Sequence, residues 1–184
     1  MPLSQLDPTA ALIVIDMQKG IVALPTVHPM SGIIDNVAKL THAFRGRMLP
    51  VILVNVTGRA PGRVEATFNF SPPPDWAELI PELDKQPDDY TVTKRNIGAF
   101  CGTALEQILR RRGVTQVFIV GVATGSGVEA TARQAYDQGY NVVLVTDAMT
   151  DLDPDIHHHA IDKVFPRIGE RVLTPEVLDR LKSP

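Results

Sequence analysis

The chain has 184 residues, of which 44% are hydrophobic, and its formal net charge is −3. This length allows one domain with a substantial core, and the weak negative charge argues against an electrostatic nucleic-acid binder. A single cysteine, Cys101, excludes an intrachain disulfide and fits a reducing compartment. No apolar run reaches the roughly 18 residues of a membrane span, and the N-terminus lacks the basic region of a signal peptide. We therefore expect a cytoplasmic protein without membrane contact.

Short apolar runs alternate along the chain with segments of helical spacing, which predicts a parallel sheet with helices on both faces. In chain order the predicted elements are strand 10–15, helix 31–48, strand 51–56, strand 90–93, helix 103–112, strand 116–120, helix 128–138, strand 141–145, helix 154–165, strand 171–173 and helix 175–181. Ser31 is the expected N-cap of the first helix. We predict one α/β domain over residues 1–184, a doubly wound, Rossmann-like six-stranded sheet of order 3-2-1-4-5-6.

The segment 59–87 is rich in proline and shows little periodicity. It is too long for an ordinary connection, and long loops in compact domains are usually functional. We therefore expect residues of this segment to contribute to a binding site.

Ligands of doubly wound sheets bind outside the carboxyl ends of the strands. Asp16 directly follows the first predicted strand, and Lys94 directly follows the third. A carboxylate and an ammonium group in one partly desolvated cleft form a working acid/base pair. The alternative is that Asp16 caps a helical turn and that Lys94 is a surface charge.

A glycine-rich turn follows the fourth predicted strand, in the segment GVATGSGVEATAR at 121–133. Such a turn directs several backbone N–H groups and the positive end of a helix dipole at one point. Residues Val122 to Ser126 are therefore candidates for an anion or oxyanion site. The alternative is a tight strand-to-helix connection that needs glycine for its backbone angles.

Gly125-Ser126-Gly127 also fits the start of a dinucleotide fingerprint, with Asp147 expected near the end of the next strand. Against this hypothesis, the motif follows the fourth strand rather than the first, and it leaves Asp16 and Lys94 unexplained. Ser126 is not favoured as a nucleophile, because the nucleophile elbow needs glycines two residues before and after the serine.

Three consecutive histidines and the single cysteine are further candidates for metal binding or catalysis. His157, His158 and His159 are consecutive, so on a helix they point in different directions and cannot share one metal ion. We expect surface or interface histidines there, and no metal site. Cys101 precedes a predicted helix, where a thiol pKa can fall, but a free cysteine is more often a packing residue.

With these residues in place, the chain resembles the isochorismatase-like hydrolases of the cysteine-hydrolase superfamily. ALIVIDMQ at 11–18 is similar to the family's opening strand, with Asp16 at its catalytic acid. The segment 93–114 is similar to the lysine motif, with Lys94 in the catalytic position. The segment 121–151 is similar to the third motif and the strand after it. The resemblance implies a six-stranded parallel sheet, a homo-oligomer, and a cis peptide between Val122 and Ala123.

The chain departs from the family pattern at Gly127, where most members place a nucleophilic cysteine. Gly125 also replaces a common Asp or Asn, and the metal-binding histidines of nicotinamidases have no match in 59–87. True isochorismatases also lack the cysteine and cleave a vinyl ether with the aspartate as acid. The resemblance therefore implies that Asp16 donates a proton, that Lys94 holds the substrate or orients Asp16, and that no thioester forms.

We expect a hydrolase for a small, anionic substrate that needs neither metal nor cofactor. The candidate substrate-binding residues are Gln18, Arg59, Arg63, Phe68 and Trp76. The arginines suit carboxylates, and the aromatic side chains would form an apolar wall. The alternative hypothesis is a family member that binds a small molecule without turning it over.

Overall fold

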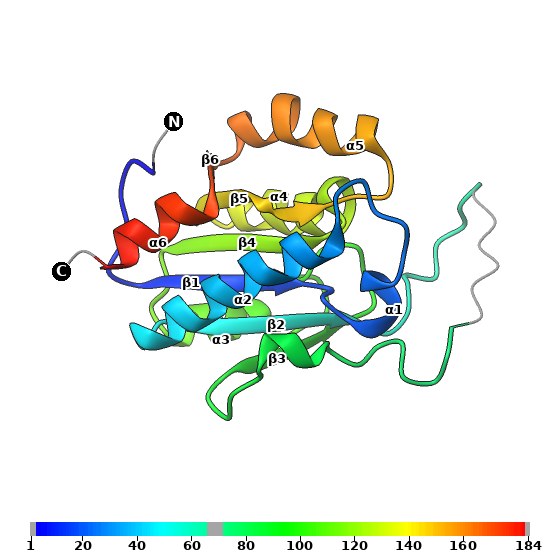
Figure 1. The fold of residues 1–184 in the computed structure, drawn as a ribbon, viewed down its shortest axis with the longest axis horizontal. Helices are drawn as coiled ribbons and strands as arrows, with labels where there is room; N and C mark the ends of the chain where they lie inside the picture. The colour runs from blue at the N-terminus through cyan, green and yellow to red at the C-terminus, as the bar shows by residue number, and fades with distance from the viewer. Residues whose placement is uncertain (1–2, 66–71, 183–184) are drawn as a thin grey trace.

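The structure is a computed structural model that describes residues 3–65 and 72–182. Six parallel strands form one sheet of order β3-β2-β1-β4-β5-β6, which confirms the predicted fold class (Figure 1). The strands are β1 (Ala10–Ile15), β2 (Val51–Val56), β3 (Tyr90–Lys94), β4 (Gln116–Val122), β5 (Asn141–Thr150) and β6 (Glu170–Val172). The four strands β1, β2, β4 and β5 are apolar over most of their length because both faces of the sheet are covered.

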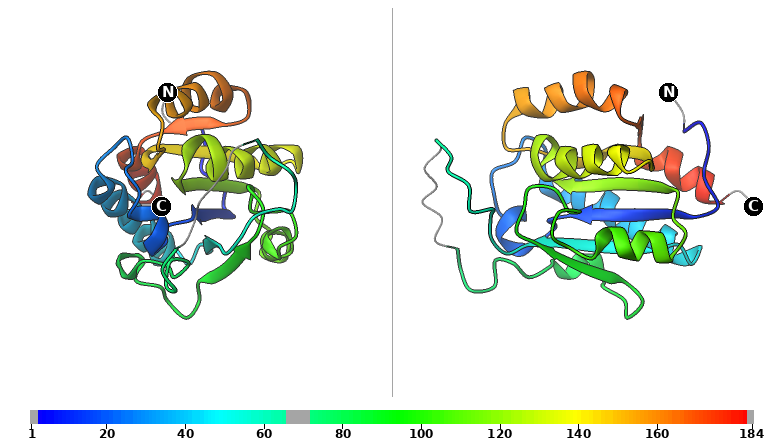
Figure 2. Two further views of the ribbon diagram at one scale, coloured as in Figure 1. Left: turned by 90° about the vertical axis from the view of Figure 1, so that its right-hand side faces the viewer. Right: turned by 180° about the vertical axis from the view of Figure 1, so that it is seen from behind.

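Helices lie on both faces of the sheet (Figure 2). The helical elements are α1 (Lys19–Val22), α2 (Met30–Gly46), η1 (Pro81–Leu83), α3 (Leu105–Arg111), η2 (Thr124–Val128), α4 (Glu129–Asp137), α5 (Pro154–His159), η3 (Ala160–Val164), η4 (Phe165–Arg167) and α6 (Thr174–Lys182). Within the described ranges, no helix is both long enough and apolar enough to cross a membrane.

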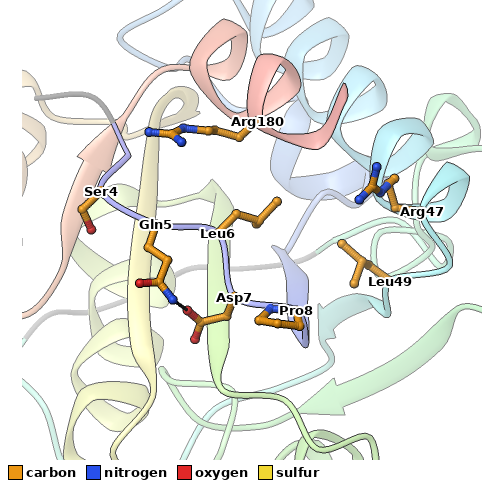
Figure 3. Close-up of a pocket in the computed structure, with 8 residues that line it drawn as sticks. All are labelled: Ser4, Gln5, Leu6, Asp7, Pro8, Arg47, Leu49 and Arg180. Carbon is orange, nitrogen blue, oxygen red and sulfur yellow. Dashed lines mark hydrogen bonds between the residues drawn. The ribbon is translucent and has the colours of Figure 1, made fainter. Parts of the chain in front are cut away.

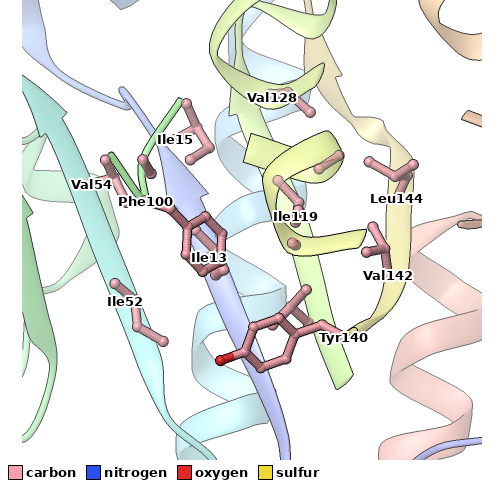
Figure 4. Packing of buried hydrophobic residues seen from close by; sticks show 14 of the residues in the cluster. Ile13, Ile15, Ile52, Val54, Phe100, Ile119, Val128, Tyr140, Val142 and Leu144 are labelled. Carbon is pink, nitrogen blue, oxygen red and sulfur yellow. The ribbon is translucent and has the colours of Figure 1, made fainter. Parts of the chain in front are cut away.

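The core consists of two apolar clusters, one on each face, because successive side chains of a strand point to opposite sides. Ile13 and Ile15 of β1 enter the cluster shared with α3, α4 and η3 (Figure 4). Leu12 and Val14 enter the opposite cluster, which α2 and α6 cover. This packing holds the carboxyl end of β1 rigidly between its neighbours.

The first two strands have the predicted bounds, but β5 is five residues longer than predicted and contains Asp147. A register shift between Ile119 and Gly121 of β4 allows the strand to continue through polar residues to Thr150. The predicted end of this strand at Val145, before Asp147, was therefore wrong.

The start of α2 also differs from the prediction. This helix begins at Met30, and its N-cap residue is Pro29, with no side-chain capping bond. Ser31 lies inside the first turn and is exposed, so its assignment as the N-cap was wrong.

Candidate active site

Asp16 and Lys94 meet at the carboxyl edge of the sheet. Lys94 is the last residue of β3 and reaches past β2 to Asp16, which follows β1; its Nζ lies 2.8 Å from Asp16 Oδ2. Both residues are buried: Lys94 is 3% exposed and Asp16 is 5% exposed. The alternative that Lys94 is a surface charge was therefore wrong. The two groups form a buried ion pair at the place where ligands bind in such sheets.

The residues that follow Lys94 hold its ammonium group. Lys94 Nζ donates to the carbonyl oxygens of Asn96 at 3.3 Å and of Ile97 at 3.0 Å, in addition to Asp16. An ammonium group has three donors, so all three can be satisfied without a substrate. This arrangement points Lys94 at Asp16 and keeps it there.

The environment of Asp16 suits a proton donor. Burial raises the pKa of its carboxyl from 3.8 to about 6, although Lys94 acts to lower it. Asp16 Oδ1 is buried and has no hydrogen-bond partner among the described residues. A carboxyl with a pKa near the working pH serves both as acid and as base. Asp16 can therefore hold a proton at mildly acidic pH and release it near neutrality.

The raised pKa makes stability depend on pH. The folded protein binds this proton more readily than the unfolded chain, so the stabilisation is complete below about pH 3.8 and is lost as the pH rises through about 6. We expect the Asp16→Asn variant, which lacks this titration, to gain on the order of 3 kcal/mol in unfolding free energy relative to the parent between pH 4 and 7. Urea unfolding of both proteins at several pH values measures this difference. A constant difference across that range would contradict the prediction.

Gly127 is the third corner of the site. A Cβ atom built on Gly127 would lie 3.3 Å from Asp16 Oδ2, 3.0 Å from Ile15 Cγ2 and 3.5 Å from the Val122 carbonyl oxygen. A side chain at this position would therefore stand directly beside the Asp16 carboxylate. The peptide bond between Val122 and Ala123 is cis, as the resemblance implies.

The rear of the turn is bonded to the end of β5 and to α5, which limits what it can offer a ligand. The Gly125 N–H donates to Asp151 Oδ2 at 2.8 Å, and Thr124 Oγ1 shares a 2.9 Å hydrogen bond with His157 Nδ1. The N–H of Ser126 donates to the Ala123 carbonyl oxygen at 3.1 Å. The expectation that Gly125 and Ser126 supply N–H groups to an oxyanion was therefore wrong, because other protein atoms already accept both.

His157 is buried within the chain, at 3% exposure, so the expectation of surface or interface histidines was wrong for this residue. Desolvation lowers the pKa of its imidazole, and the nearby His28 and His158 lower it further. Its spacing from Ala160 and Val164, which are also buried, places it on the inner face of the helical segment. That apolar spacing is the feature of the sequence that predicts the burial.

Gln18 has a structural task instead of the predicted contact with substrate. It is fully buried, and its amide group bonds both polar atoms of the Val56 backbone: Nε2 donates to the carbonyl oxygen and Oε1 accepts from the N–H. Nε2 also donates to the Trp76 carbonyl oxygen at 3.2 Å. These bonds occupy both ends of the side-chain amide, so the assignment of Gln18 to substrate binding was wrong.

The other residues predicted to bind substrate lie in or near the long loop. Trp76 is half-buried and packs beside Gly20, where an added Cβ would meet the Trp76 Cβ at 2.7 Å. Arg59 and Arg63 are exposed, and their segment extends away from the body of the protein (Figure 1). Phe68 lies outside the described residues. The substrate contacts of Arg59, Arg63, Phe68 and Trp76 remain predictions.

The structure does not support the dinucleotide hypothesis. Asp147 Oδ1 accepts from both the N–H and the hydroxyl of Thr174, at 2.7 and 2.8 Å, so it caps the start of α6. A Cβ added to Gly125 would collide with the side chain of Ile156. Gly125 is therefore required for packing against α5, and Asp147 is required for a helix start.

Concave surfaces occur away from this edge. One pocket of about 450 Å³ is lined by residues before β1 together with Arg47 and Arg180 (Figure 3). It lies at the amino ends of the strands, opposite Asp16. Across the described residues, no group of three or more His, Cys, Asp or Glu side chains is placed to hold a metal ion. Cys101 is exposed, and its carbonyl oxygen accepts a hydrogen bond from Asn96 Nδ2.

A six-stranded parallel sheet of this order, with helices on both faces, is the fold of the isochorismatase-like hydrolases. The chain belongs to the isochorismatase family, whose isochorismatase domain profile matches residues 10–176. It is 41% identical over 181 residues to the uncharacterized isochorismatase family protein YwoC of Bacillus subtilis, with 94% of each chain covered.

Two further similarities agree with this assignment. A solved structure of an isochorismatase family protein from Burkholderia thailandensis has a TM-score of 0.88 and 39% identity, and 99% of each chain is covered. The chain is also 28% identical over 186 residues to a Bacillus subtilis protein named isochorismatase, covering 96% of this chain and 60% of that protein.

Proposed function

We propose that this protein hydrolyses a small anionic substrate of the isochorismate type, a vinyl ether, with Asp16 as the general acid. The observation that carries the proposal is the buried Asp16–Lys94 pair beside a position that has no side chain. A cysteine-dependent attack has no nucleophile at Gly127, whereas protonation of a vinyl ether needs only an acid.

The reaction follows from the charges of the pair. The protonated Asp16 carboxyl donates its proton to the terminal carbon of the vinyl ether, and positive charge develops on the ether carbon and oxygen. Water adds to that carbon and loses a proton, and the resulting hemiketal separates into a ketone and an alcohol. The Lys94 ammonium stabilises the Asp16 carboxylate that remains after proton donation. Solvent then returns a proton to Asp16.

In this proposal, the lack of a side chain at Gly127 lets the substrate approach Asp16. Gly127→Ala places a methyl group 3.3 Å from Asp16 Oδ2. We expect it to raise KM or lower kcat by about tenfold, because the reacting atoms are displaced. Gly32→Ala is the matched control, since an added Cβ at this helical position meets nothing within 4 Å. Steady-state kinetics of both variants test the role, and unchanged kinetics in Gly127→Ala would contradict it.

Mass spectrometry of the purified protein incubated with isochorismate and with a panel of amides tests the function itself. Release of pyruvate from isochorismate supports the proposal. Cleavage of amides without cleavage of isochorismate overturns it.

The same absence of a nucleophile favours a second candidate function, the binding of a small anion without turnover. In that case a ligand raises the melting temperature but is recovered unchanged after prolonged incubation. Measuring the melting temperature and the recovery of the ligand in one sample therefore distinguishes the two candidate functions. Both candidates presume a small-molecule partner; homo-oligomerisation and a cytoplasmic location remain predictions from the sequence.

A further inference from the structure

Helix α4 adjoins two segments of the candidate site: the turn η2, which contains Gly127, and the loop that follows Lys94. It begins at Glu129, directly after η2, and its inner face contacts the loop. A fully buried threonine, Thr131, lies on that inner face. Within the described residues, no hydrogen bond joins Thr131 to Asp16 or Lys94, so its own hydrogen bonds need a separate explanation.

The Thr131 hydroxyl makes two hydrogen bonds that join the turn η2 to the loop after Lys94. It donates to the Gly127 carbonyl oxygen at 2.6 Å and accepts from the Ala99 N–H at 3.1 Å. A bond from threonine to the carbonyl four residues earlier is common in helices. The bond to Ala99 is not local, because it fixes a buried amide of the lysine loop to the helix.

A second side chain of the same helix face repeats this contact. Gln134 Oε1 accepts from the Phe100 N–H at 3.1 Å, and a Cβ added to Gly98 would collide with the Gln134 side chain. Two successive amides of the loop are therefore bonded to side chains three residues apart on α4, a spacing that places both on one face.

The same loop holds the Lys94 ammonium through the carbonyl oxygens of Asn96 and Ile97. The connections run from α4 through Thr131 to the loop, from the loop to Lys94, and from Lys94 to Asp16 Oδ2. We infer that Thr131 is a positioning residue, which sets Lys94 against Asp16 and fixes both relative to Gly127. This inference rests on the proposed roles of Asp16 and Lys94, but it can be tested without a substrate.

The readout is the pKa of Asp16, measured by carbon-13 NMR titration of its carboxyl signal, which the Asp16→Asn variant identifies. Lys94 is the charged group that acts on Asp16 within the described residues, and Thr131 carries no charge. A change at Thr131 can therefore reach this pKa only by moving Lys94 or by changing the burial of Asp16.

The test compares Thr131→Val, which keeps the shape of the side chain, with Thr131→Ser, which keeps the hydroxyl. In Thr131→Val we expect the pKa of Asp16 to rise above the parent value of about 6, because Lys94 is held less firmly and lowers it less. We expect Thr131→Ser to stay near the parent value. If the protein hydrolyses the substrate, the alkaline limb of its rate profile moves upward with the NMR value.

Thr41→Val is the matched control. Thr41 is also buried in a helix and donates to a carbonyl within its own helix, that of Ala38, but it lies in α2 on the opposite face of the sheet. An unchanged pKa in Thr131→Val, or an equal change in Thr41→Val, overturns the inference. Should Thr131→Val not fold, Gln134→Met removes the neighbouring bond and is expected to raise the same pKa; no rise there also overturns it.

The two proposals fail in different ways. If no variant and no parent protein turns over substrate but the pKa of Asp16 responds to Thr131 as stated, the proposed function fails and the inference on Thr131 stands. If isochorismate is hydrolysed but the pKa of Asp16 is indifferent to Thr131, the reverse holds.

Discussion

Asp16→Asn is expected to reduce turnover by about 10³-fold or more, because an amide cannot deliver the proton on which the proposed reaction depends. The substitution is nearly isosteric and leaves Lys94 bonded to the carbonyl oxygens of Asn96 and Ile97. The loss should therefore fall on kcat rather than on KM. Rates with an identified substrate, measured between pH 5 and 8, give the comparison.

The matched control for this substitution is Asp35→Asn, the same change at an exposed residue of α2. It should leave the rate unchanged. If Asp16→Asn keeps more than a tenth of the parent rate, Asp16 is not the acid, and the raised pKa of its carboxyl is only a consequence of its burial.

Lys94→Met is expected to have the second largest effect on turnover. Without the ammonium group, burial alone acts on Asp16, so its pKa rises above 6 and the carboxyl becomes a weaker acid. We expect a loss of about 10²-fold in kcat, since the carboxylate left by proton transfer has lost its counter-charge. Kinetics and the carbon-13 titration of Asp16 measure the two consequences separately.

The same variant should lose stability in a way that depends on pH. Removing one partner of a buried pair costs about 3–5 kcal/mol when the other stays charged. Asp16 can avoid this cost by keeping its proton, so the loss is small at pH 5 and grows as the pH rises through its folded-state pKa. Lys39→Met, at an exposed position of α2, is the control. Equal losses for Lys94→Met at pH 5 and pH 8 would contradict the coupling of the two groups.

The contacts behind the turn explain why its residues differ so much in what they can do. Gly125 and Thr124 are bonded to Asp151 and His157, so that face of the turn belongs to the scaffold. Gly127 faces Asp16 instead. A turn that looks uniform in sequence therefore has one face that supports the fold and one that faces the candidate site.

Much of the fold follows from local patterns in the sequence. β1 and β2 are short apolar runs bounded by polar residues or proline, and their bounds were predicted correctly. The extension of β5 was not predictable, because Thr146 and Asp147 look like the end of a strand. They continue the strand because β4 shifts its register beside them.

The site was predictable where position along a strand decides it. Asp16 and Lys94 each come at the carboxyl end of a buried strand, and parallel strands bring these ends to one edge. Gln18 lies two residues from Asp16 but bonds to the backbone of Val56, a segment distant in sequence. Polarity alone does not distinguish a side chain that contacts substrate from one that bonds the backbone.

The sequence by itself determined the fold class, the positions of Asp16 and Lys94 at the carboxyl ends of parallel strands, and the absence of a side chain at Gly127, because strand order and residue identity settle them. Only the tertiary structure decided the pKa of Asp16 and the hydrogen bonds of the turn and the lysine loop. Burial raises the pKa of Asp16, Asp151 occupies the Gly125 amide, and Thr131 joins the turn to the lysine loop. Each of these depends on which distant atoms come within hydrogen-bond distance and how much water they exclude, and neither is encoded in local spacing.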